Sequence, residues 1–199
     1  AAAVHPNKQK LLARAAEFLA EVEDLQTLLR PHFDFHPLTA PITSTPGRDL
    51  EERLNREYGP GNPYYEDFCS LIRQGIENNE GWVATDEIDG PKYRRSRIQS
   101  PTEACRYFSI TTVYMDSQDV YRGQYHAHPY GEINCVVQLE PTAELMGMSG
   151  WQGAGWTSPG PGTHHYPEVR GGALVALFFL PAGRISYKAK PGAPQPLSI

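Results

Sequence analysis

The stretch Gly123–Asn134 reads Gly-Gln-Tyr-His-Ala-His-Pro-Tyr-Gly-Glu-Ile-Asn and places two histidines and a carboxylate within seven residues. In an extended strand, side chains alternate between the two faces, so His126 and His128 are expected to point the same way. Pro129-Tyr130-Gly131 is a turn signal that would bring Glu132 back to the same point. Two imidazoles and a carboxylate suit a borderline divalent metal such as iron, manganese, zinc or nickel.

A second cluster follows about thirty residues later and reads Trp-Thr-Ser-Pro-Gly-Pro-Gly-Thr-His-His from Trp156 to His165. His-x-His-x-x-x-Glu followed by Gly-x-x-His resembles the two motifs of the cupin superfamily. That spacing selects His165 as a further ligand, and the adjacent His164 leaves the register open. We predict a metal site, which is also the catalytic centre, made of His126, His128, Glu132 and His165. Two alternatives remain, a cupin pocket that works without metal and histidines with structural roles only.

Length and composition limit the classes of protein that this chain can represent. With 199 residues and 40% hydrophobic residues, it fits one domain with a modest appendage. The net charge of -5, with scattered basic residues, argues against a nucleic-acid partner. No apolar run approaches the roughly 20 residues that span a bilayer, so no membrane partner is expected. The three cysteines are far apart, which favours a reducing compartment and hence the cytoplasm: Cys69, Cys105 and Cys135.

The first eighty residues are predicted to be mostly helical. Apolar residues recur at three- and four-residue spacing over residues 8–30, which predicts an amphipathic helix that ends at Pro31. Asp49 is expected to cap a second helix, and Asn62-Pro63 reads as the start of a third. Two histidines of the intervening Pro/Thr/Ser-rich linker are expected to be solvated: His32 and His36.

From residue 81 onward the pattern changes to short strands joined by loops rich in glycine and proline, which indicates a sandwich or small barrel. The clearest strands are residues 93–98, 108–115, 133–139 and 173–180. The predicted organisation has four parts: an N-terminal helix and linker (1–47), a helical segment packed on the barrel (48–80), a cupin-like β-barrel (81–188) and a tail (189–199). The chain carries neither Gly-x-Gly-x-x-Gly nor a P-loop, so no nucleotide cofactor is expected.

A longer series of residues is similar to the family of 4-hydroxylaminobenzoate lyases from about residue 48 to 187. Its anchors, in chain order, are Asn55, Tyr58-Gly59-Pro60-Gly61-Asn62, Gly81-Trp82, Tyr93, Arg95, the two histidine motifs, Gly155-Trp156, Pro167, Gly171-Gly172 and Leu180-Pro181-x-Gly183. The resemblance implies a mainly β, cupin-like barrel or jelly roll with an N-terminal helical region. It also implies conversion of 4-hydroxylaminobenzoate into 3,4-dihydroxybenzoate and ammonia.

A small aromatic substrate with a carboxylate would need a planar cation that forms two hydrogen bonds. Arg95 is the first candidate because it matches the family pattern, and Arg97 shares its strand parity. A solvent-facing position is the alternative for both arginines. An aromatic wall around the substrate is predicted from four residues, for each of which core packing is an equal explanation: Tyr93, Tyr125, Trp156 and Tyr166.

Two other functions fit the same residues. Three histidines and a glutamate also suit a metal-dependent dioxygenase or isomerase that acts on an aromatic molecule. A non-enzymatic, small-molecule-binding cupin is the third possibility. In each case the N-terminal helical region makes a homo-oligomer, most simply a dimer, the expected assembly.

Overall fold

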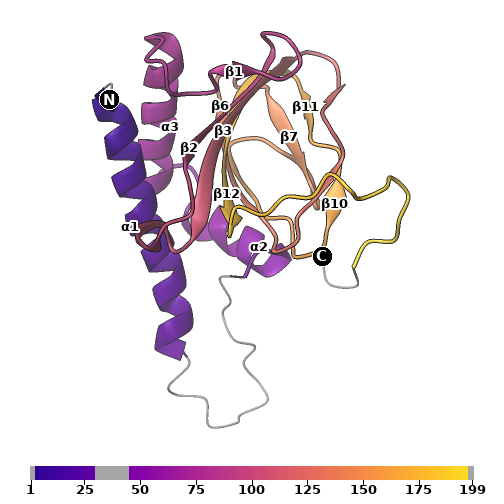
Figure 1. The fold of residues 1–199 in the computed structure, drawn as a ribbon, viewed down its shortest axis with the longest axis horizontal. Helices are drawn as coiled ribbons and strands as arrows, with labels where there is room; N and C mark the ends of the chain where they lie inside the picture. The colour runs from indigo at the N-terminus through magenta and orange to yellow at the C-terminus, as the bar shows by residue number, and fades with distance from the viewer. Residues whose placement is uncertain (1–2, 30–44, 197–199) are drawn as a thin grey trace.

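The computed structural model describes residues 3–29 and 45–196. The predicted loop histidines His32 and His36 lie outside the described residues. The described chain combines three α-helices and one 3-10 turn (Glu103–Cys105) with antiparallel strands, so the mainly β class with a helical N-terminal region is confirmed (Figure 1).

The three helices begin close to the positions that the sequence indicates: α1 spans Pro6–Leu29, α2 Arg48–Glu57 and α3 Pro63–Glu77. Asn62 caps α3, since its side chain accepts hydrogen bonds from the backbone of Tyr64 and Tyr65, and Pro63 occupies the first turn. The prediction that Asp49 caps α2 is wrong. Gly47 is the residue at the cap position. Asp49 lies inside the first turn, where its negative charge stabilises the helix through the helix dipole. None of the helices in the described part is long and apolar enough to cross a membrane.

The strands form two main sheets and one short pair (Figure 1). The larger sheet has the order β1-β2-β3-β12-β6-β9, with bounds Asp86–Glu87, Tyr93–Gln99, Phe108–Ser117, Gly172–Pro181, Ile133–Gln138 and Gly155–Thr157. The smaller sheet has the order β4-β11-β7-β8, with bounds Tyr121–Arg122, Glu168–Arg170, Glu144–Gly147 and Gly150–Gln152. The pair consists of β5 (His126–Ala127) and β10 (His164–His165).

This arrangement is a jelly-roll sandwich, and the four strongest predicted strands are all present. The described strands do not form the closed barrel that the sequence pattern also allows. The larger sheet keeps two edges, β1 and β9, and the smaller sheet packs against it as a separate layer.

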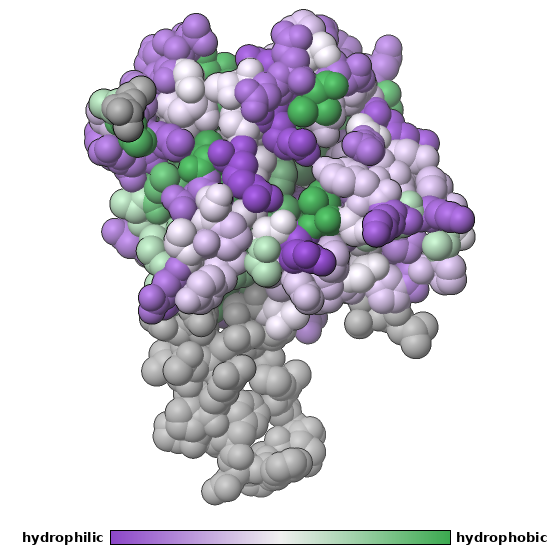
Figure 2. Space-filling model, viewed as in Figure 1, coloured by the Kyte–Doolittle hydropathy of each residue, from purple (hydrophilic) through white to green (hydrophobic). Residues whose placement is uncertain are grey.

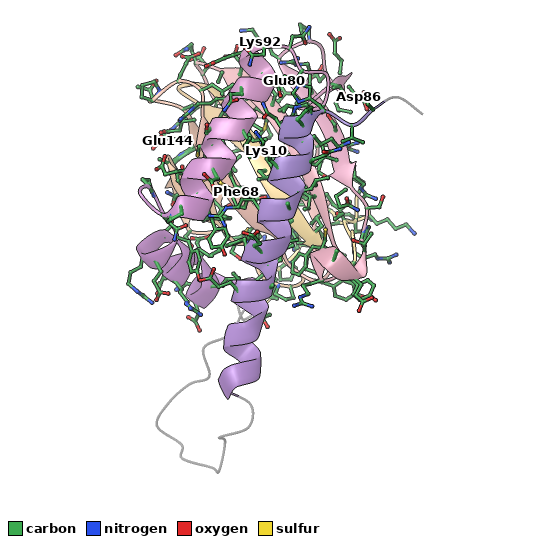
Figure 3. The ribbon with its side chains drawn as sticks, turned by 90° about the vertical axis from the view of Figure 1, so that its left-hand side faces the viewer. Lys10, Phe68, Glu80, Asp86, Lys92 and Glu144 are labelled. Atoms are coloured by element: carbon green, nitrogen blue, oxygen red, sulfur yellow. The ribbon has the colours of Figure 1, made fainter. Side chains whose placement is uncertain are left out.

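The helices cover one face of the larger sheet, and Figure 3 shows α1 and α3 side by side over it. Between them and the sheet, Phe18 stacks on Trp156 with ring centroids 5.0 Å apart. On β6 the side chains alternate as a strand requires. Ile133, Cys135 and Val137 join this helix-facing core, whereas Val136 joins a second core between the two sheets. Glu132 and Asn134 lie on the same face as Val136, so their side chains point into the space between the two sheets.

Candidate active site

Two short strands bring three histidines together. Strand β5 pairs antiparallel with β10, so that His165 lies opposite His126 and His164 lies opposite Ala127. Directly opposed residues in a pair share one face, and His128 shares the face of His126. One nitrogen from each of His126, His128 and His165 lies within 4.8 Å of the others. The structure thus selects His165, and not His164, as the partner of the first motif.

In two of these rings, hydrogen bonds to backbone carbonyl oxygens determine which ring nitrogen carries the hydrogen. His126 Nδ1 lies 3.0 Å from the carbonyl oxygen of Gln124, and His128 Nδ1 lies 3.0 Å from that of Thr163. A carbonyl oxygen only accepts, so Nδ1 is the donor in both neutral rings. The two Nε2 atoms are 3.0 Å apart and face each other with their lone pairs. A shared cation would stabilise this arrangement, which is the usual way in which backbone carbonyls orient metal-binding histidines.

The three rings are also held in the neutral form. Burial lowers the pKa of His126, and it lowers that of His128 well below its ordinary value, with the neighbouring imidazoles adding to the effect. For His165, burial and the adjacent histidines lower the pKa to about 3. Among the described residues, none hydrogen-bonds to the buried Nδ1 of His165. Neutral imidazoles with free lone pairs are the form that binds a divalent metal, so this donor set fits such an ion.

Glu132 returns to the cluster through the predicted turn. Gly131 has φ 83° and donates its N–H to the carbonyl of His128, so the chain reverses between the histidine and the glutamate. Glu132 Oε2 lies 3.8 Å from His128 Nε2, and Asn134 Nδ2 donates to Oε1 at 2.6 Å. Burial raises the pKa of Glu132 to about 7, against the lowering effect of the Asn134 hydrogen bond. At neutral pH this carboxyl group can both give and take a proton.

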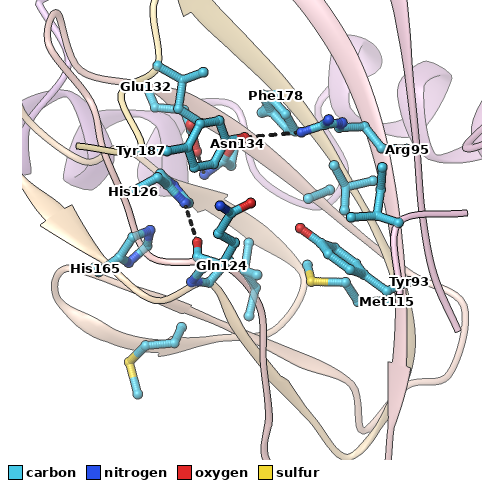
Figure 4. Close-up of a pocket in the computed structure, with 17 residues that line it drawn as sticks. Tyr93, Arg95, Met115, Gln124, His126, Glu132, Asn134, His165, Phe178 and Tyr187 are labelled. Atoms are coloured by element: carbon cyan, nitrogen blue, oxygen red, sulfur yellow. Dashed lines mark hydrogen bonds between the residues drawn. The ribbon is translucent and has the colours of Figure 1, made fainter. Parts of the chain in front are cut away.

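His126, His165 and Glu132 border a cavity of about 140 Å³ between the two sheets (Figure 4). An apolar protein cavity of about 150 Å³ holds one benzene molecule, so the space accommodates a single aromatic ring. His126, His165 and Glu132 lie on one side of it, and Arg95 and Tyr93 on the other (Figure 4). Apolar side chains form most of the remaining wall: Ile88, Val113, Met115, Leu145, Met146, Pro167, Ala176, Phe178 and Ile185.

Residues 35–187 match the family model for PnbB, 4-hydroxylaminobenzoate lyase. The chain belongs to the 4-hydroxylaminobenzoate lyase family. A 4-hydroxylaminobenzoate lyase of Nocardioides sp. (strain LMS-CY) is 60% identical over 149 residues, which are 75% of this chain and 87% of that protein. A 4-hydroxylaminobenzoate lyase of Pseudomonas putida is 46% identical over 188 residues, which are 90% of this chain and 95% of that protein.

Among solved structures, an RmlC-like cupin protein from Ralstonia eutropha JMP134 is 15% identical, with a TM-score of 0.39, and the match covers 50% of this chain and 62% of that one. Membership of the lyase family, and with it the nature of this protein as an enzyme, rests on the sequence matches.

Within this lyase-family chain, the predicted substrate-binding residues have different locations. Tyr93 and Arg95 line the cavity. Arg97 is exposed and lines a second, outer hollow that Arg95 also borders. Tyr125 does not line the cavity; its hydroxyl hydrogen-bonds to Nδ1 of His164, and its ring packs on Tyr166.

The prediction for Trp156 is corrected by the structure. Its fully buried ring packs on Phe18, and its Nε1 donates to the carbonyl of Tyr58 at 2.9 Å. The next residue on β9, Thr157, instead takes the interior face and accepts a hydrogen bond from Asn134. Strand parity therefore turns the tryptophan towards the helices, where it can contact no substrate.

Several cavity residues were not predicted. Asn134 shares the interior face of Glu132 because it lies two residues further on, so the alternation of β6 is a signal that could have identified it. Gln124 borders the cavity just before the first histidine. Ile185 and Tyr187 reach it from the C-terminal segment, which carries no periodic pattern.

The raised pKa of Glu132 has a consequence for stability that can be measured without metal. The folded chain holds the Glu132 proton with a pKa of about 7, compared with 4.5 ordinarily. The neutral carboxyl group therefore contributes stability that is complete below about pH 4.5 and is lost as the pH rises through about 7. Compared with Glu132→Gln, the wild-type protein should lose roughly 3 kcal/mol of unfolding free energy between those limits. Urea unfolding in the presence of EDTA measures the free energy of unfolding of both proteins. The histidines are the same in both, so their contribution cancels in the difference. A difference that stays constant with pH would contradict the assignment.

Proposed function

We propose that this protein converts 4-hydroxylaminobenzoate, or a close analogue, into 3,4-dihydroxybenzoate and ammonia within the cavity. The observation on which this proposal rests is the arrangement of residues around the cavity. A protonatable carboxyl group and a histidine cluster face Arg95 across a space of one aromatic ring. The proposal is also supported by the two 4-hydroxylaminobenzoate lyases that share 60% and 46% of their aligned residues with this chain.

The overall reaction balances without an external oxidant or reductant. One hydroxylaminobenzoate and one water contain the same atoms as one dihydroxybenzoate and one ammonia. The nitrogen is reduced as the N–O bond breaks, and the ring carbon ortho to the nitrogen-bearing carbon is oxidised as oxygen replaces its hydrogen. This reaction therefore needs a site that transfers protons and holds the substrate in a fixed orientation, and it needs no redox cofactor.

Glu132 has the position and the pKa for the proton transfers. In its protonated form it donates to the hydroxylamine oxygen, which leaves as water while the ring electrons form an electron-poor imine. Its carboxylate then takes a proton from the water that adds to the ring carbon beside the imine. A second water hydrolyses the imine, which releases ammonia and leaves a ketone that becomes the catechol by a proton shift. Asn134 keeps the carboxyl group oriented through its hydrogen bond to Oε1.

The histidine cluster is the proposed holder of a divalent ion. His126, His128 and His165 would bind it, with Glu132 close enough to be either a fourth ligand or the neighbouring acid. When bound, the ion would supply Lewis acidity at the hydroxylamine oxygen. Imidazole and carboxylate ligands accept iron, manganese, zinc and nickel, so the chemistry of the donor set does not select one of them.

Arg95 is the proposed partner of the substrate carboxylate. Its guanidinium borders the cavity opposite the histidines, and a carboxylate can form two parallel hydrogen bonds with it. Tyr93 lies beside Arg95 on β2 and presents its hydroxyl to the same space (Figure 4). With the carboxylate at Arg95, a para hydroxylamino group would reach the histidine side.

An ammonia-release assay under argon tests this function against the dioxygenase alternative. The purified protein is given 4-hydroxylaminobenzoate in anaerobic and air-saturated buffer, and ammonia and 3,4-dihydroxybenzoate are quantified. The proposal predicts equal rates in the two buffers and one ammonia for each catechol. Turnover that requires oxygen would instead indicate a dioxygenase, and conversion without ammonia would indicate an isomerase.

The cytoplasmic location and the homodimer also remain proposals. Figure 2 shows one face of the molecule, where hydrophobic residues are scattered among hydrophilic ones and form no broad patch. Stable interfaces between identical subunits are more apolar than such a surface, so we do not expect the dimer contact on this face. Light scattering coupled to size-exclusion chromatography measures the subunit number directly.

A further inference from the structure

The C-terminal segment from residue 182 to residue 196, which we call the C-terminal strap, borders the cavity. Ala127 and Ser186 exchange backbone hydrogen bonds of 2.7 and 3.0 Å, so the strap lies antiparallel beside the strand that carries His126. On either side of this pairing, Ile185 and Tyr187 point into the cavity wall. The strap is therefore part of the site, although it contains no regular strand of its own.

The far end of the strap is held by the histidine that the active site does not use. The Gln195 side chain donates to the backbone oxygen of His164 at 2.6 Å and accepts from its backbone nitrogen at 3.1 Å. His164 Nε2 lies 3.2 Å from the carbonyl of Pro194. The adjacent histidines thus have two different roles: His165 faces the cavity, and His164 holds the strap that borders it.

Tyr187 connects the two ends of the cavity. Its ring lies edge-on to that of His126, with centroids 6.2 Å apart, and its hydroxyl oxygen accepts a hydrogen bond from Arg95 Nη1 at 3.1 Å (Figure 4). Because the oxygen accepts from Arg95, its own hydrogen remains available to a second acceptor. A carboxylate at Arg95 would be that acceptor, held by a guanidinium and a phenol together.

The same tyrosine is one of five residues that lie between the cavity and the outer hollow. Ile88, Phe178, Ile185, Arg95 and Tyr187 border both spaces, and the outer hollow adds the exposed Arg97. An anionic substrate that arrives through the outer hollow would meet the Arg95–Tyr187 pair before it reaches the histidines. Its carboxylate can then take both hydrogen bonds while its ring enters the cavity.

We infer that Tyr187 is a specificity-determining residue that selects aromatic acids with a para carboxylate, an inference that rests on the proposed function. One phenol ring spans the distance from His126 to Arg95, and a para-substituted benzoate has its two groups at the ends of a ring in the same way. A meta isomer directs its carboxylate away from that line. A ring without a carboxylate leaves the Arg95–Tyr187 pair unsatisfied by the ligand.

The first test compares Tyr187→Phe with the control Tyr107→Phe, which alters a tyrosine that is 60% exposed. Hydrogen bonds to charged groups are the stronger kind, so Tyr187→Phe should raise KM for 4-hydroxylaminobenzoate about tenfold. Its kcat should stay within about twofold, and its kcat/KM for N-phenylhydroxylamine, which has no carboxylate, should not change. Gln195→Ala should show the same selective loss because it releases the strap. Equal losses on both substrates, or no loss on either, would overturn the inference.

A binding measurement separates this inference from the proposed function. Calorimetric titration of 4-hydroxybenzoate and 3-hydroxybenzoate requires no turnover. The wild type should bind the para isomer about tenfold more tightly, and Tyr187→Phe should remove most of that preference. If the wild type shows this preference but releases no ammonia from 4-hydroxylaminobenzoate, the selection by Tyr187 stands and the proposed reaction is wrong. If neither protein distinguishes the isomers, the selection itself is wrong.

Discussion

Glu132→Gln is expected to lower kcat for 4-hydroxylaminobenzoate by about 10²- to 10⁴-fold, the usual contribution of a positioned acid–base group. The amide keeps the shape of the side chain and can still accept the hydrogen bond from Asn134, but it can no longer give a proton to the leaving oxygen. KM should change by less than about threefold, because the substrate carboxylate binds at the opposite side of the cavity. Steady-state kinetics with ammonia as the readout measures both constants.

Glu168→Gln is the matched control for this substitution. That carboxylate pairs with Arg122 at the surface of the smaller sheet, and its loss should leave kcat unchanged. If Glu132→Gln retains more than about a tenth of the wild-type kcat, the acid must be another group. The alternative would then be the histidine cluster alone.

His126→Ala is expected to remove bound metal and to reduce kcat/KM by at least about 10³-fold, since a Lewis acid contributes several kcal/mol to such a step. His126 supplies one of the two facing Nε2 atoms, and its backbone pairing in β5 does not depend on its side chain. Elemental analysis after dialysis should find one divalent ion per wild-type chain and less than about a tenth of that in the variant. Circular dichroism verifies that the variant is folded.

His5→Ala is the control for the loss of a histidine, because His5 contacts Glu80 at the other end of the molecule. It should retain both metal and activity. Full activity in a wild-type preparation stripped of metal would contradict the role proposed for the ion. In that case the three neutral imidazoles would have to act through their own hydrogen bonds.

Much of the site could be read from the sequence because its residues lie close together along the chain. The alternation of a strand puts His126 and His128 on one face, and a turn that needs a glycine at φ 83° brings back Glu132. The choice between His164 and His165 could not be made in this way. It depends on the register of β10 against β5, which is a contact between distant segments.

The errors have the same physical origin. The aromatic ring of Trp156 predicts a contact with the substrate. The layer that a strand residue faces depends on the tertiary packing, however, and here Trp156 faces the helices, which bury it. Tyr187 belongs to a coil whose position depends on the pairing of Ser186 with Ala127, nearly sixty residues away. Local patterns predict which side chains share a face, whereas the partner across the cavity is fixed only by the folded sandwich.

The most direct test of the account follows the oxygen atoms of the product. The reaction is run under argon in water enriched in oxygen-18, and 3,4-dihydroxybenzoate is analysed by mass spectrometry. If the hydroxylamine oxygen leaves as water and two waters attack the ring and the imine, both phenolic oxygens carry the label. A product with a single labelled oxygen would mean that the hydroxyl group migrates from nitrogen to carbon, and it would contradict the reaction proposed for this site.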